Sequence, residues 1–165
     1  NIFVYHATQP LSTVKRYLVM IPENAHLESG FFHSLARVWN IGKNSDAVIS
    51  FYAPENIINV LKKIIKKVNI EADFVVINSW ADAEKKAEKI KDNEGLILIL
   101  AKRGMTSYFP KMRYIPDFLN KKLPNKNYLL IYPYSKTDND NTEIRSVRNH
   151  DDFVEIGNII KKIFR

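Results

Sequence analysis

The sequence contains no cysteine, which excludes disulfide bonds and thiolate chemistry and is typical of a protein kept in a reducing compartment. It also contains no apolar run near the roughly 20 residues that a membrane-spanning helix requires. The first residues, Asn1–His6, have neither the basic start nor the long apolar middle of a signal peptide. Because the chain also lacks an initiating Met, we expect it to be a domain cut from a longer protein.

Glycine is scarce, with five residues scattered along the chain. Neither G-x-G-x-x-G nor a Walker pattern occurs, so a glycine-rich phosphate-binding loop is excluded. The four histidines show no H-E-x-x-H spacing, and no nucleophile is visibly paired with a base. Asp138 and Asp140 resemble the start of a calcium loop, but Glu143 and Asn149 replace the glycine and glutamate that such a loop needs. We therefore expect no metal site, no catalytic residues and no enzyme activity.

The net charge of +7 raises the question of an anionic partner. Lysine occurs in pairs that flank apolar positions of expected helices: Lys62-Lys63, Lys66-Lys67, Lys85-Lys86, Lys121-Lys122 and Lys161-Lys162. We favour the interpretation that these pairs form solvated helix faces. The alternative is contact with anionic inner-leaflet lipids, for which the first two pairs form the densest patch. Nucleic acid is disfavoured, because the lysines are spread over several helices instead of one face.

Apolar runs alternate with helical patterns, which is typical of a fold built from β-α-β units. The expected buried strands are Tyr17–Ile21, Ala47–Tyr52, Phe74–Ile77, Leu96–Leu100 and Tyr128–Tyr132. Right-handed crossovers place the connecting helices on both faces of such a sheet. We therefore predict an α/β, Rossmann-like, mainly parallel five-stranded sheet with helices on both faces, formed by residues 16–165. Residues 1–15 are expected to be an extended segment and linker, with a short edge strand at its start.

Helix boundaries can be predicted at several positions. Asn24 is a candidate cap for the first long helix, and Gly42 is a candidate C-terminal glycine of that helix. Ser79, followed three residues later by Asp82, has the spacing of a capping box.

The last helix is expected to begin at Asp151, which can cap it. Its apolar residues share one helical face, and they are Phe153, Ile156, Ile160 and Phe164.

The candidate site follows the central strand, Leu96–Leu100, which is apolar on both faces and ends abruptly at a cationic loop. In the strand order 3-2-1-4-5, this loop lies beside the end of the first buried strand, where ligands collect. The candidate anion- or ligand-binding residues are Glu23, Asn24, Lys102, Arg103, Gly104, Thr106 and Ser107. Two cations and two hydroxyls beside a glycine can hold a phosphate or carboxylate. An ordinary polar loop, whose hydroxyls satisfy its own backbone, explains the same residues equally well.

The order of strands, helices and loops over Arg16–Arg165 resembles that of the universal stress protein domain, a Rossmann-like α/β fold. In its nucleotide-binding members, the first strand ends in Asp and the loop after the fourth strand carries several glycines. Here Pro22-Glu23 stands at the first position, and Arg103-Gly104 fits the start of the loop. Met105–Pro110 lacks the later glycines. The resemblance implies a nucleotide or another anion as the candidate ligand.

Three stretches are similar to the cytoplasmic tail of bacterial sodium/proton (monovalent cation/proton) antiporters: Lys15–Asn24, Ala101–Pro110 and Tyr128–Pro133. That tail is a degenerate stress-protein domain that follows the membrane helices, and the R-G-x-x-S-Y-x-P pattern at 103–110 is the most specific part of the match. The resemblance implies a soluble regulatory or assembly domain without catalysis of its own. It would lie on the cytoplasmic side of the bacterial inner membrane, as part of an integral membrane protein whose membrane domain is its partner.

The same resemblance implies a homodimer, because stress-type domains usually pair through the sheet edge beyond the fifth strand. Here that strand is Tyr128–Tyr132, and an exposed strand edge is prone to pair with another chain. The alternative function is that of a stand-alone universal stress-type protein that binds an adenine nucleotide or another anion.

Overall fold

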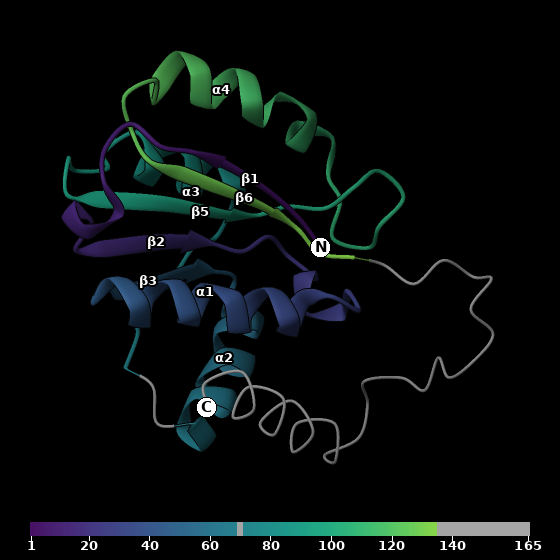
Figure 1. Ribbon diagram of the computed structural model, residues 1–165. Coiled ribbons are helices and arrows are strands. Elements are labelled where there is room, and N and C mark those ends of the chain that lie inside the picture. Colours follow the sequence, from purple (N-terminus) through teal and green to yellow (C-terminus); the bar gives the residue numbers. More distant parts are fainter. Residues whose placement is uncertain (69–70, 135–165) are drawn as a thin grey trace.

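The computed structural model describes residues 1–68 and 71–134 of the chain (Figure 1). The strands are β1 (Ile2–His6), β2 (Arg16–Met20), β3 (Val48–Ala53), β4 (Asp73–Val76), β5 (Glu94–Ile99) and β6 (Tyr128–Tyr132). The α-helices are α1 (Phe31–Ser45), α2 (Glu55–Val68), α3 (Trp80–Ala87) and α4 (Ile115–Lys122). Three short 3-10 helices are η1 (Leu11–Thr13), η2 (Ala25–Leu27) and η3 (Pro110–Tyr114). Within these ranges no helix combines the length and the apolar character needed to cross a membrane. The predicted helix that begins at Asp151 lies outside the described residues.

The strands form one sheet in the order β1-β6-β5-β2-β3-β4. Strands β2 to β6 are parallel, and β1 pairs antiparallel with β6. The predicted α/β, Rossmann-like, mainly parallel sheet is confirmed, with six strands where five were expected. Without β1, the order is the expected 3-2-1-4-5. The chain therefore builds outward from β2 to β4, and then starts again on the other side of β2 with β5.

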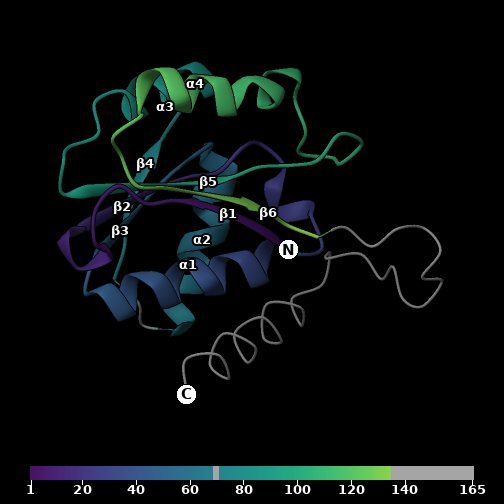
Figure 2. The same ribbon diagram turned by 45° about the horizontal axis from the view of Figure 1, so that its top comes forward.

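Helices cover both faces of the sheet, with α1 and α2 on one face and α3 and α4 on the other (Figure 1; Figure 2). Each face has its own core. On β2, Tyr17 and Val19 belong to the core under α1 and α2, whereas Leu18 and Met20 belong to the core under α3 and α4. Burial on both faces explains why the central strands are continuous apolar runs rather than alternating ones.

The N-terminal segment is joined to the sheet through β1. Its register with β6 runs from Ile2 opposite Tyr132 to His6 opposite Tyr128, and the rings of His6 and Tyr128 stack at 4.7 Å. The expectation that β6 forms an exposed sheet edge is therefore wrong, because β1 occupies the hydrogen-bonding groups on its outer side. The free edge on this side of the sheet is β1, whose apolar side chains are about half exposed, as for Phe3 at 45%.

A buried amide fixes the segment that follows β1. The Asn127 side chain, 1% exposed, accepts hydrogen bonds from the backbone N–H groups of Thr8 at 2.7 Å and Gln9 at 3.2 Å. Its Nδ2 donates to the Gln9 carbonyl oxygen at 3.0 Å. Asn127 thereby holds the end of the N-terminal segment against the start of β6.

Two predicted helix boundaries are wrong, and one is confirmed. Asn24 has a left-handed backbone and precedes η2, with no capping hydrogen bond from its side chain. The helix α1 begins later, after Gly30, where a Cβ atom would lie 2.6 Å from the backbone nitrogen of Tyr134. Gly42 lies inside α1 and makes room for the Ile49 side chain. The Ser79 cap is confirmed, since its hydroxyl accepts from the Asp82 N–H at 3.3 Å.

Replacing Asn127 with Ala should lower the free energy of unfolding by about 1–3 kcal/mol, because partly buried N–H groups of the 8–9 segment lose their acceptor. Urea unfolding followed by tryptophan fluorescence measures the change. Asn125→Ala is the matched control, since its exposed side chain makes none of these bonds, and a change within about 0.5 kcal/mol is expected. Equal unfolding midpoints for the two variants would contradict this role of Asn127.

Candidate functional site

A cavity of about 230 Å³ lies where the parallel strands β2, β3 and β4 end and the loop after β5 passes over them. Its lining residues are Ile21, Pro22, Glu23, Asn24, Pro54, Ile77, Asn78, Ser79, Trp80, Thr106, Ser107, Tyr108 and Phe109. From β2 the chain continues to β3 on one side, whereas from the neighbouring β5 it continues to β6 on the other side. The cavity lies at this topological switch point of the sheet. The strand order thus creates the hollow, and the loops after the strands supply its walls.

The structure brings four of the seven predicted site residues together. Glu23, Asn24, Thr106 and Ser107 line the cavity. The other three, at positions 102–104, belong to the same loop but are not among the lining residues.

These three residues form an exposed turn in the loop after β5. Gly104 has a φ of +93°, a conformation that side chains other than glycine rarely adopt. The turn is closed by the Met105 N–H, which donates to the Lys102 carbonyl oxygen at 3.1 Å. Both cations of the predicted site, Lys102 and Arg103, are therefore presented to solvent rather than to the cavity.

Ser107 is bound by a buried carboxylate of the same chain. Its N–H and its hydroxyl both donate to Glu28 Oε1, each at 2.8 Å. Glu28 is 7% exposed and Ser107 is 5% exposed. The Ser107 hydroxyl, one of the groups that were expected to hold an anion, is thus already engaged, and the contact joins the segment after β2 to the loop after β5. Sequence reasoning missed Glu28, because its partner is 79 positions away and no local pattern marks it.

The charge of the cavity wall is low and negative. Among its lining residues, Glu23 is the formally charged one, and its side chain is exposed. In η2, burial lowers the pKa of His26, which favours the neutral form of its imidazole. The wall therefore does not attract an anion through charge. The described residues also contain no group of three or more histidine or acidic side chains that could hold a metal ion.

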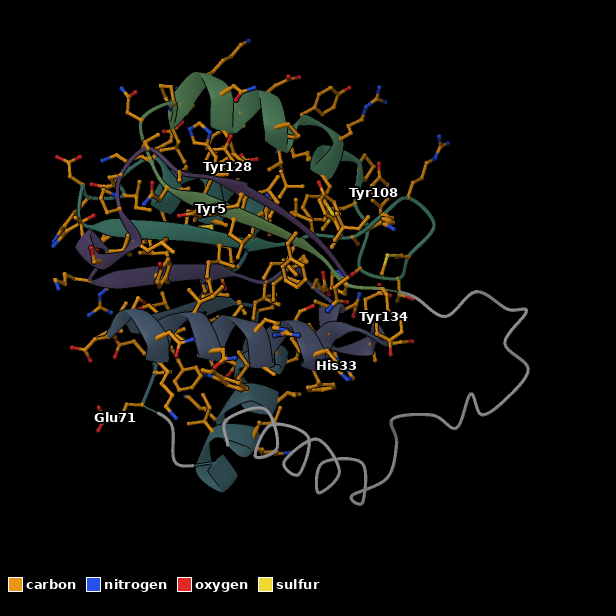
Figure 3. The ribbon with its side chains drawn as sticks, in the orientation of Figure 1. Tyr5, His33, Glu71, Tyr108, Tyr128 and Tyr134 are labelled. Atoms are coloured by element: carbon orange, nitrogen blue, oxygen red, sulfur yellow. The ribbon has the colours of Figure 1, made fainter. Side chains whose placement is uncertain are left out.

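Aromatic side chains form much of the wall. Trp80 at the start of α3 and Phe109 have ring centroids 5.1 Å apart, inclined at 56°. Tyr108, labelled in Figure 3 on the loop after β5, also lines the cavity. The indole N–H of Trp80 is buried and has no hydrogen-bond partner among the described residues. Asn78 and Thr106 add neutral donors and acceptors. This arrangement suits an aromatic ring that also accepts a hydrogen bond.

Replacing Glu28 with Ala should lower the free energy of unfolding by about 1–3 kcal/mol, because the buried N–H of Ser107 loses its acceptor. Glu28→Gln keeps a carbonyl acceptor and should cost less than the Ala variant. Glu23→Ala, which removes an exposed carboxylate from the same segment, should change the free energy by no more than about 0.5 kcal/mol. If chemical denaturation gave the same midpoint for Glu28→Ala and Glu23→Ala, the carboxylate could not be holding the loop.

The sequence and the structure were compared with protein-family models, curated proteins and solved structures, and none of the three comparisons gives a match. Evidence for function therefore comes from the chain itself: its Rossmann-like sheet, the cavity at the strand ends, and the residues that build the loop above it.

Proposed function

We propose that this chain is a non-catalytic regulatory domain of a bacterial monovalent cation/proton antiporter, and that its strand-end cavity binds a small aromatic heterocycle of the nucleobase or nucleoside class. The observation that carries the ligand proposal is the aromatic, nearly uncharged cavity at the switch point of the sheet. The antiporter assignment rests on the sequence resemblance, above all on the R-G-x-x-S-Y-x-P pattern.

The residues of that pattern build the loop over the cavity, which supports a link between the resemblance and ligand binding. Gly104 provides the turn, and Ser107 anchors the loop to Glu28. Tyr108 lines the cavity, and Pro110 begins η3. A loop held in this way is pre-formed for a ligand, so that binding costs less conformational entropy.

The size of the cavity and its polar groups limit the ligand. A volume of about 230 Å³ is below the roughly 300–1,000 Å³ of pockets that enclose drug-sized molecules, so one ring system and little more can enter. Trp80, Tyr108 and Phe109 line the cavity with aromatic rings, and Asn78 and Thr106 offer neutral hydrogen-bonding groups. A free phosphate or carboxylate would meet Glu23 and no cation among the lining residues.

An adenine nucleotide is the second candidate ligand, as for a stand-alone universal stress-type protein. The observation in its favour is that Lys102 and Arg103 are exposed on the loop that borders the cavity. With the base in the cavity, the phosphates would have to lie outside it, where these two cations could meet them.

From the resemblance we also propose partners for the domain. Its membrane partner would be the transport domain of the same protein, and two copies would associate, with β1 rather than β6 as the strand edge open to pairing. Contact with anionic inner-leaflet lipids stays a prediction for α2, on which Lys62 and Lys63 are exposed. The side chains of Lys66 and Lys67 lie outside the described part of the chain.

Ligand binding can be measured with the two tryptophans, because Trp39 is a core residue packed on Phe51 whereas Trp80 lines the cavity. In a Trp39→Phe variant, adenosine should quench the remaining indole in a saturable way. Trp80→Ala should weaken adenosine binding in calorimetry by about 5- to 150-fold, which corresponds to the roughly 1–3 kcal/mol of one base–aromatic stack.

Arg103→Ala separates the two candidate ligands in the same assay. It should leave adenosine affinity unchanged, and it should weaken AMP binding if the phosphate reaches the loop. Loss of AMP binding with no adenosine binding in the wild type would favour the nucleotide alternative. No saturable signal with nucleobases, nucleosides or nucleotides at millimolar concentration would exclude the proposed ligand class.

The antiporter assignment has its own test. The reading frame that encodes Asn1–Arg165 should also encode about a dozen apolar spans, each of the roughly 20 residues needed to cross a bilayer. In membrane vesicles, sodium-driven proton exchange by that protein should respond to deletion of residues 16–165 and to Trp80→Ala. Exchange that is identical with and without the domain would contradict a regulatory role, and a reading frame without such spans would contradict the assignment itself.

A further inference from the structure

The segment that leads from the end of β5 through η3 carries basic residues and no acidic ones. Residues 101–114 include Lys102, Arg103, Lys111 and Arg113, and they contain neither Asp nor Glu. All four basic side chains are exposed, and none of them forms an ion pair with another residue of the ranges 1–68 and 71–134. Their positive charges are therefore uncompensated.

A buried methionine holds the two basic parts of this segment together. The Ala101 N–H donates to Met112 Sδ at 3.3 Å, and Met112 is 4% exposed. Ala101 directly precedes Lys102, and Met112 lies between Lys111 and Arg113. Figure 1 shows the loop after β5 and the start of α4 at the same end of the domain. The turn and η3 thus form one basic surface, here called the cationic corner.

An exposed aromatic ring belongs to the same surface. Tyr114, the last residue of η3, is 56% exposed, more than any other large hydrophobic side chain of the described residues. The Arg113 guanidinium lies 5.0 Å from the centroid of its ring. Tyrosine is enriched at the headgroup level of membranes, because its ring is apolar and its hydroxyl is polar. Uncompensated cations beside such a ring suit an anionic lipid surface.

We propose that the cationic corner binds the anionic headgroups of a membrane surface, with Tyr114 at the headgroup level. The inference rests on the proposed function, because a domain tethered to a transport protein is held beside a bilayer. Each Lys or Arg near an anionic leaflet strengthens binding about fivefold. The four cations of the corner lie on two adjoining segments, so that one contact can use all of them.

Other basic parts of the domain are less available to an anionic surface. Near the C-terminal end of α4, Lys122 and Lys126 each form an ion pair with an acidic residue. In α2, the Lys62 ammonium lies over the Phe74 ring, 5.7 Å from its centroid. Single-stranded nucleic acid is a weaker match for the corner, because successive bases stack on several rings and Tyr114 is the exposed one here.

Vesicle binding with charge-matched variants tests the proposal. At about 50 mM salt the wild-type chain should sediment with vesicles of phosphatidylglycerol and phosphatidylethanolamine, and about 0.5 M salt should abolish this binding. Vesicles of phosphatidylcholine alone should not bind. Lys111→Gln combined with Arg113→Gln should weaken binding about 25-fold. Lys62→Gln combined with Lys63→Gln removes the same charge from exposed positions of α2 and should weaken it no more than about twofold.

Several results would overturn the proposal. Absence of wild-type binding at low salt would exclude lipid contact, and an equal loss in both double variants would show that net charge alone is responsible. A larger loss for the α2 variant would assign the contact to α2. Displacement of the bound chain by millimolar inorganic phosphate would assign the corner to a free anion. Tighter binding to duplex DNA than to the vesicles would assign it to nucleic acid.

A fluorescent label tests the position of the ring, because the chain contains no cysteine of its own. Tyr114→Cys carrying an environment-sensitive dye should shift its emission to shorter wavelength on the anionic vesicles. Asn125→Cys is the matched control, since it is exposed on the turn that follows α4, and it should show no shift. Equal shifts at both positions would contradict contact through the corner. Both experiments are independent of adenosine binding and of the reading frame, so their failure is distinguishable from failure of the proposed function.

Discussion

The parallel pairing of β2 with β5 is the interaction on which the rest of the structure depends. These strands lie far apart in the sequence but share a register from Arg16 opposite Glu94 to Met20 opposite Leu98. Both are buried on both faces, so their side chains contribute to the two cores at once. Their adjacency also creates the switch point, because the segments that follow them leave in different directions. The cavity is a direct consequence of that geometry.

A cavity formed by loops keeps its shape only if those loops are held in place. Here a buried carboxylate holds them, since Glu28 receives both donors of Ser107. A buried carboxylate without partners would be costly, so the pair is stable only while the two loops stay together. The exposed turn before Ser107 is free of this constraint, which leaves Lys102 and Arg103 available to a ligand or partner. The regulatory role proposed above would use both features, the walls held in place and the exposed cationic turn.

The N-terminal strand changes which surfaces of the domain are available. By pairing with β6, β1 moves the free sheet edge outward by one strand. It also extends the sheet beyond the reach of α1, which leaves Phe3 and Tyr5 over an uncovered groove. The segment 1–15, expected to be an extended segment and linker, therefore contributes to two of the surfaces through which this domain can meet another element or another chain.

The sequence by itself determined the class of fold and the position of its parallel strands, because periodicity and burial on both faces are local properties of the chain. It also located the strand-end loops, and four of the seven predicted site residues, such as Glu23 and Thr106, line one cavity. Only the tertiary structure decided that Glu28 binds Ser107, that Trp80 forms a cavity wall, and that β1 covers β6. These contacts join residues separated by dozens of positions in the chain. No local pattern specifies them, because they form only when distant elements are packed against the same sheet.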